Sequence, residues 1–198
     1  MGRQRAQHPH RLEGPMTSFL PEPDPEAGNW LPPAEFIATL PRATVYASLY
    51  ITDQHGRPVL LNSSVYKPDK GQIWQFPGGQ MDPHETPRQA AMRETIQETG
   101  LTLQCGRLLA VHYLPPEPTW PANKFGLVFD GGPLSPEQLA AIRLDPAEHS
   151  EWDARPVEDW SDVLNPRSLD RLRQVAASAG SGTTAYIEHG ECGFVDYI

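Results

Sequence analysis

Apolar and β-branched runs alternate with polar segments along the chain and predict strands separated by helices. Strands are expected at residues 44–51, 59–62, 73–76, 108–113 and 125–129, the first two as a hairpin turning at residues 53–58. Helices are expected at residues 135–143 and 167–177, and residues 185–188 and 194–198 are expected to be extended or loose. Strands in mixed succession with helices predict an α/β fold whose sheet is packed between helices.

Residues 76–101 combine a glycine turn with a helix whose ends are clearly marked. Gly78 and Gly79 follow an apolar strand, where they allow a tight bend and leave a carbonyl free to approach a ligand or ion. The helix is expected at residues 87–99. Its signals are a capping box, a proline in the first turn and a left-handed stop: Thr86 with Gln89, Pro87, and Gly100.

Carboxylates gather on one face of this helix. Glu94 and Glu98 are four residues apart and therefore lie one above the other, with Gln97 beside them. A solvated helix face is the ordinary explanation for such charges, and Glu98 is expected on an exposed face. Glu85 before the helix and Arg93 within the acidic run instead favour an oxygen-ligand site for a hard cation such as Mg²⁺ or Mn²⁺.

The same segment resembles the signature of the Nudix hydrolase family. That signature is a glycine, five residues, a glutamate, seven residues, and then R-E-U-x-E-E-x-G-U, where U is bulky and apolar. The matching positions carry the required spacing: Gly79, Glu85, Arg93, Glu94, Glu98, Gly100 and Leu101. The chain departs from the pattern at Gln97, where the first glutamate of the pair belongs, and at Thr95, where an apolar residue is usual.

The resemblance implies a Nudix-like α/β/α sandwich with a mixed sheet and a metal-dependent active site. It implies that Glu85 pairs with Arg93 to fix the helix and that these two act with Glu94 and Glu98 in catalysis. The implied metal ligands are Glu94, Glu98, the Gly78 carbonyl, Gln97, and a later carboxylate for which Glu148 is the first candidate and Glu151 the second. His149 lies between those two acids and could serve as a base, although a single histidine in a polar loop is more often an exposed bystander.

The implied activity is a Nudix-type pyrophosphohydrolase that cleaves a phosphoanhydride bond in a nucleoside diphosphate linked to another moiety, for example ADP-ribose. Pro116 lies fifteen positions past Leu101, as in ADP-ribose hydrolases of this family, although the surrounding loop is rich in proline. Candidate substrate-binding residues are aromatic and basic side chains outside the signature: Trp74, Lys67, Tyr113 and Trp120. Trp74 next to a glycine turn could equally be a core residue.

Two other classes of function are weighed against this enzyme. One is a nucleotide-binding sensor or regulator with weakened catalysis, for which the neutral Gln97 is the motivation. The other is an interaction protein that works through its proline-rich N-terminal segment and loop. Turnover on a panel of substrates with each metal separates the first alternative from the enzyme, and removal of residues 1–33 separates the second.

Length, charge and cysteine content limit the number of domains, the class of partner and the location that the sequence allows. The 198 residues suffice for one domain, and a net charge of −9 argues against a broad surface for duplex nucleic acid or an anionic membrane. Cys105 and Cys192 have no C-x-x-C pairing and fit reduced thiols. With neither a spanning stretch nor a signal-like segment, a cytoplasmic protein acting on a small nucleotide is expected, and a homodimer is left open.

The predicted organisation has three parts. Residues 1–33, rich in proline and poor in aliphatic side chains, are expected to be disordered. Residues 34–182 are expected to form the Nudix domain, and residues 183–198 a tail or an extra strand.

Overall fold

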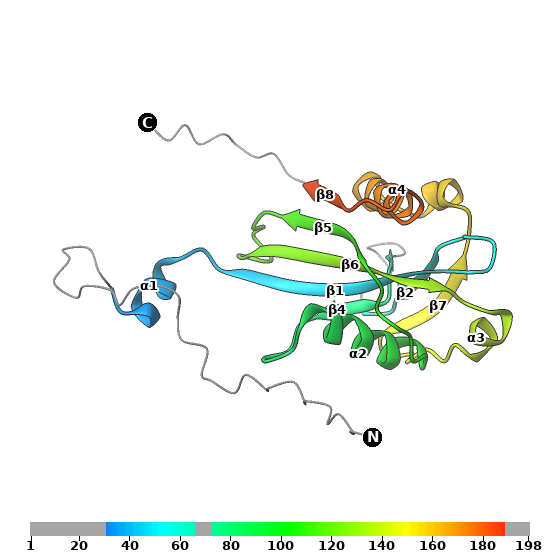
Figure 1. Ribbon diagram of the computed structural model, residues 1–198, viewed down its shortest axis with the longest axis horizontal. Coiled ribbons are helices and arrows are strands. Elements are labelled where there is room, and N and C mark those ends of the chain that lie inside the picture. Colours follow the sequence, from blue (N-terminus) through cyan, green and yellow to red (C-terminus); the bar gives the residue numbers. More distant parts are fainter. Residues whose placement is uncertain (1–30, 66–72, 189–198) are drawn as a thin grey trace, which may run out of the picture. The chain divides into compact units, whose positions relative to one another are not determined.

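The computed structural model describes residues 31–65 and 73–188, and the chain divides into two units, Met1–Leu40 and Pro41–Ile198. In the first unit, helix α1 (Pro33–Thr39) begins with a proline in its first turn and exposes Phe36 and Ile37. The second unit contains the other elements in Figure 1. The predictions for residues 1–30 and 194–198 fall outside the described residues.

A five-stranded mixed sheet forms the centre of the second unit (Figure 1). Its order is β4-β1-β6-β5-β8, with bounds Gly78–Gln80, Ala43–Thr52, Asn123–Pro133, Leu108–Leu114 and Ala185–Glu188. Strand β1 is parallel to β6 and antiparallel to β4, while β5 is antiparallel to β6 and parallel to β8. The prediction of a mixed sheet is therefore confirmed, and residues 185–188 are a strand.

A second sheet has three strands in the order β3-β2-β7, with bounds Trp74–Gln75, Val59–Ser63 and His149–Ala154. The predicted hairpin of the first two strands is wrong, because β1 and β2 join different sheets and meet at a single bridge between Thr52 and Pro58. Strand β6 occupies one edge of β1 from Ala43 to Thr52, and β4 occupies the other edge at residues 46–48, so the chain leading into β2 meets β1 only at its Thr52 end.

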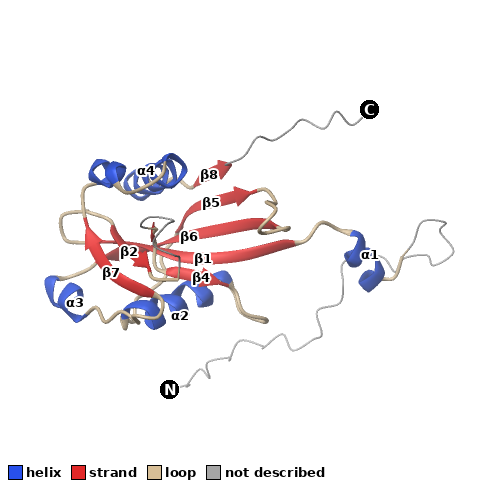
Figure 2. Ribbon diagram, turned by 180° about the vertical axis from the view of Figure 1, so that it is seen from behind, coloured by secondary structure: helices blue, strands red, loops and turns tan. Residues whose placement is uncertain are grey.

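Helices cover the five-stranded sheet on two sides, as Figures 1 and 2 show for α2 (Pro87–Thr99) and α4 (Pro166–Ser181). Alternate side chains of β1 enter two separate cores, because successive strand residues point to opposite faces. Leu49 packs with Ala90 and Ala91 of α2, whereas Tyr50 packs with Leu172 of α4. The α/β/α arrangement expected from the sequence is confirmed.

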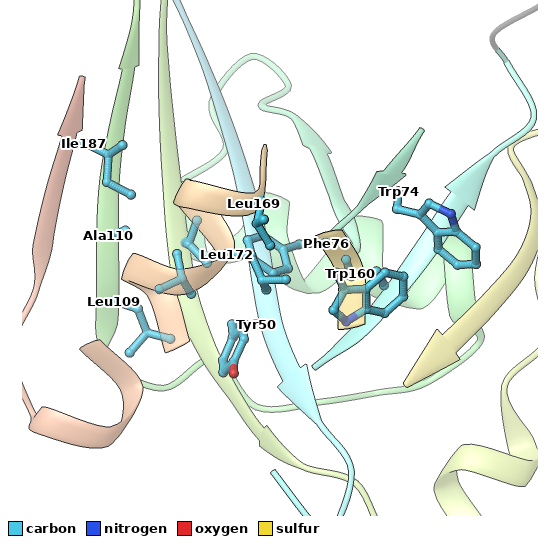
Figure 3. Packing of buried hydrophobic residues seen from close by; sticks show 12 residues of the cluster. Tyr50, Trp74, Phe76, Leu109, Ala110, Trp160, Leu169, Leu172 and Ile187 are labelled. Atoms are coloured by element: carbon cyan, nitrogen blue, oxygen red, sulfur yellow. The ribbon is translucent and has the colours of Figure 1, made fainter. Parts of the chain in front are cut away.

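The core under α4 is rich in aromatic side chains (Figure 3). Trp74 and Trp160 lie edge to face with ring centroids 5.1 Å apart, and Tyr50 and Phe76 do so at 5.7 Å. Trp160 belongs to a short 3₁₀ helix, Val157–Asp162, that precedes α4. This core holds strand β3 against α4 and so fixes the chain just before the Gly78 turn.

The predicted helices are found with small changes in extent. Helix α2 has the predicted bounds, α3 covers Pro136–Ala141, and α4 is longer than residues 167–177 at both ends. Two elements differ from expectation. Gly78–Gln80 is the strand β4 rather than only a turn, and His149–Ala154 is the strand β7, which its polar sequence does not suggest.

Candidate active site

Helix α2 has the ends that its sequence predicts, and these fix where its carboxylates lie. The Thr86 side chain accepts a hydrogen bond from the Gln89 backbone and completes a capping box, and Gly100 adopts the left-handed conformation with φ of 73°. Thr95 is buried, and its hydroxyl donates to the Ala91 carbonyl at 2.7 Å. This internal hydrogen bond explains how the helix accommodates a hydroxyl where an apolar residue is usual.

Glu98 lies at the centre of the site and is buried, with only 4% of the residue exposed. Its Oε2 accepts a hydrogen bond from the Gly78 backbone N–H at 2.7 Å, and its Oε1 lies 2.9 Å from His149 Nε2. The expectation that Glu98 occupies an exposed helix face is therefore wrong. The carboxyl instead joins α2, the start of β4 and the start of β7.

His149 is also not the exposed bystander that its polar neighbours suggested. It is 2% exposed, and its Nδ1 lies 3.0 Å from the Glu148 carbonyl oxygen. Strand β7 carries it to Glu98 from 51 residues away in the sequence. Because one ring nitrogen faces a carbonyl and the other faces the carboxyl, the ring orientation is fixed.

Burial favours the neutral forms of both groups. It raises the pKa of Glu98 to about 8, the Gly78 N–H opposes this rise, and the charges of Glu94 and Glu148 add to it. Burial also lowers the pKa of His149 below its usual value, against the charges of Glu148 and Asp145. The acidic groups around Glu98 thus create a local excess of negative charge that a cation would relieve.

Arg93 organises the outer side of the site. Its Nε and Nη2 each lie 2.9 Å from the two carboxylate oxygens of Glu85, so the expected Glu85–Arg93 pair is confirmed as a bidentate contact. Its Nη1 donates to Glu94 Oε1 at 2.8 Å and to Gln97 Oε1 at 2.9 Å, and its Nη2 also donates to the Gln80 carbonyl. Hydrogen bonding to Arg93 holds the pKa of Glu85 below its usual value.

The two glycines of the turn are required for different reasons. A Cβ at Gly79 would lie 2.5 Å from Glu94 Cδ, so this glycine makes room for the carboxyl group. A Cβ at Gly78 would lie 2.5 Å from the Ser48 backbone of β1, and Gly78 has a φ of 152°. Gly78 therefore allows β4 to approach β1 closely, whereas Gly79 leaves space for the Glu94 carboxylate.

The donor set fits a hard divalent ion in kind. Glu94, Glu98 and Glu148 offer carboxylate oxygens, and their charges act on one another, as the pKa of Glu98 shows. Within the described residues, three ligating side chains do not converge as a ready-made cage. Glu148 is exposed, and Glu151 accepts a hydrogen bond from Asn62 at 3.0 Å, so Glu148 is the better placed of the two later candidates.

The substrate candidates are not brought to one place. Trp74 is 4% exposed and belongs to the core, which favours the structural role weighed for it. Tyr113 donates to Asn123 and packs on Phe125, at the β5–β6 end of the sheet. Trp120, 37% exposed, donates to Thr44 from the loop between those strands. Lys67 lies outside the described residues.

The sequence profile of the NUDIX domain matches residues 41–175. The chain belongs to the Nudix family. An RNA pyrophosphohydrolase of Mesorhizobium japonicum is 29% identical over 128 residues, which are 54% of this chain and 70% of that relative. Diphosphoinositol polyphosphate phosphohydrolase 3-alpha of Homo sapiens is 43% identical over 65 residues, which are 33% of this chain and 38% of that relative.

Solved structures of Nudix proteins share the fold. A MutT protein from Methanosarcina mazei superposes with a TM-score of 0.58 and 23% identity, covering 70% of this chain and 96% of that one. A C. elegans Ap4A hydrolase complex superposes with a TM-score of 0.51 and 24% identity. The match covers 68% of this chain and 98% of that one. The prediction of a Nudix-type pyrophosphohydrolase is thus confirmed at the level of family and fold. In the described part of the chain, helices are too short or too polar to cross a membrane.

Replacing Arg93 by alanine is expected to lower both activity and stability. The change releases Glu85, Glu94 and the Gln80 carbonyl together, and loss of groups that orient ligands typically costs about 10- to 100-fold in activity. Thermal unfolding and initial rates check this. Arg173→Ala is the matched control, because Arg173 pairs with the exposed Glu158 on another face. A stable and fully active Arg93→Ala variant would refute the assignment.

Proposed function

We propose that this Nudix protein is a metal-dependent hydrolase that cleaves a phosphoanhydride bond in a nucleoside diphosphate linked to another moiety. The observation that carries the proposal is the buried Glu98 carboxyl, held between the Gly78 N–H and His149 with Glu94 and Glu148 close enough to act on its pKa. A bound cation would favour the charged form of Glu98, which burial disfavours. Two relatives are named as an RNA pyrophosphohydrolase and a diphosphoinositol polyphosphate phosphohydrolase, and these names support the same reaction class.

Some residues of the site would hold a metal ion, and others would position those ligands. Members of the Nudix family generally use divalent metals, and a bound ion would shield phosphate oxygens and lower the pKa of the attacking water. Glu94, Glu98, Glu148 and the Gly78 carbonyl would hold it. Arg93 keeps Glu94 in position through their ion pair, and His149 keeps the Glu98 carboxyl turned toward the Gly78 turn.

A panel of nucleotides, sugar nucleotides, dinucleotides and capped RNA tests the proposal when each is incubated with Mg²⁺ or Mn²⁺ and the phosphate-containing products are identified. We expect two phosphorylated products from one class of diphosphate, and none after chelation of the metal. Tight nucleotide binding without turnover on the whole panel would favour the sensor instead. Three points are predictions made from the sequence alone: the use of Mg²⁺ or Mn²⁺, a cytoplasmic location and a homodimer.

Gln97 gives a separate prediction about the metal. Its carbonyl oxygen is neutral and accepts a hydrogen bond from Arg93, so it adds no charge to the site. We expect Gln97→Glu to lower the metal concentration for half-maximal rate severalfold, because a further carboxylate attracts the ion. A metal titration of the initial rate checks this. An unchanged curve would mean that position 97 faces away from the ion.

A further inference from the structure

A pocket lies on the α4 side of the second unit, separate from the carboxylates of α2. Its volume is about 280 Å³, and it is lined by β3, β5, the loop after β5 and the first turns of α4. The lining residues used below are Gln75, Glu117, Arg167 and Arg171. We call it the arginine pocket. Arg167 and Arg171 were not singled out in the sequence, although their spacing of four residues places them on one helix face.

The arginine pocket is positively charged in a chain that is strongly acidic. It contains two arginines and one glutamate, whereas the whole chain carries a net charge of −9. Like charges four apart on a helix repel each other. An anion bound between or above them would relieve this repulsion.

The arginines are poorly neutralised within the described residues. The Arg171 Nη1 donates to the Tyr46 hydroxyl at 3.3 Å, and its guanidinium lies 5.1 Å from the centre of the Phe76 ring. Neither partner is a carboxylate. Arg167 reaches Glu117 at 4.0 Å, with 62% of its side chain exposed. The Tyr46 contact and the Phe76 ring hold Arg171 in place while leaving its positive charge available to a ligand.

The pocket and the carboxylate site adjoin the same short segment of the chain. Gln75 lines the pocket, and Gly78, three residues later, donates to Glu98. Three residues span at most about 11 Å when fully extended. This short separation along the chain is the reason to consider one extended substrate for both places.

We propose that the arginine pocket binds a second phosphate group of the substrate, distinct from the diphosphate that is cleaved. This inference rests on the proposed function, because it gives the substrate class more exactly: a nucleoside diphosphate derivative whose other moiety carries its own phosphate. Arg171 and Arg167 contact that phosphate as charge-assisted donors, and Glu117 limits its affinity by repulsion. The guanidinium fork suits phosphate oxygens better than an uncharged sugar.

Calorimetry with inorganic tripolyphosphate tests the pocket in the absence of divalent metal, where the carboxylate site attracts no phosphate. Binding to the full chain is expected to weaken about 10- to 100-fold in Arg171→Gln and in Arg167→Gln, as the loss of a charged hydrogen bond predicts. Arg171→Lys should recover part of the loss, and Glu117→Gln should tighten binding. Arg173→Gln removes the same charge from another face of α4 and should bind like the wild type.

Equal binding by the wild type, Arg167→Gln and Arg171→Gln would overturn the proposal, as would an equal loss in Arg173→Gln. Should Arg171→Gln fail to fold, the exposed Arg167 carries the test. On the substrate identified by the panel, Arg167→Gln should raise KM more than it lowers kcat. The panel could stay uncleaved while calorimetry shows that tripolyphosphate binding depends on Arg167 and Arg171. In that case the proposed hydrolysis is wrong, and the arginine pocket is still an anion site.

Discussion

Replacing Glu98 by glutamine is expected to reduce kcat/KM by at least about 100-fold, because it removes the buried carboxylate that joins α2, the Gly78 turn and β7. The fold should persist. The glutamine amide keeps an acceptor for the Gly78 N–H and is neutral in an environment where burial already raises the pKa of the carboxyl to about 8. The melting temperature should therefore stay at or above the wild-type value.

Initial rates at saturating Mg²⁺ and a thermal unfolding curve check both halves of this result. Glu137→Gln provides the matched control, because it makes the same chemical change at an exposed position of α3. Wild-type turnover in Glu98→Gln would remove Glu98 from the metal site. A large fall in melting temperature would instead show that its charge supports the fold.

Replacing Gly79 by alanine is expected to cost about 10- to 100-fold in kcat/KM with little loss of stability. The new Cβ would lie 2.5 Å from Glu94 Cδ, so the end of a flexible side chain must move away from its place beside Arg93. Gly78→Ala should behave differently. Its Cβ meets the backbone of β1 at a φ of 152°, so the fold itself should lose about 1–3 kcal/mol.

Initial rates and unfolding curves of the two alanine variants show which glycine is needed for activity and which is needed for the stability of the sheet. Gly180→Ala in α4 is the control, since its Cβ would meet no heavy atom within 4 Å. Equal stability losses in Gly78→Ala and Gly79→Ala, or full activity in Gly79→Ala, would contradict the division of roles described for them.

The parts of the site that depend on local chemistry were predictable from the sequence. The capping pair Thr86 and Gln89, the stop at Gly100 and the spacing of Glu94 and Glu98 act within a few residues, so the helix and its carboxylate face follow directly. The pairing of Glu85 with Arg93 followed from the family resemblance.

The contacts that complete the site depend on pairing between distant segments. His149 reaches Glu98 only because β7 pairs with β2, and residues 149–154 carry too many polar side chains to be recognised as a strand. Gly78 forms a strand although glycine disfavours one, because β1 needs a close neighbour there. Arg171 meets Tyr46 across 125 residues, a contact that helical spacing alone does not suggest.

The central claim is that the carboxylates around Glu98 hold a divalent ion. Electron paramagnetic resonance of free Mn²⁺, titrated with the 198-residue wild type and with Glu98→Gln, measures this without any substrate. We expect the wild type to deplete the free-ion signal and Glu98→Gln to need at least about tenfold more protein for the same depletion. Identical depletion curves for the two proteins, both folded, would contradict the account.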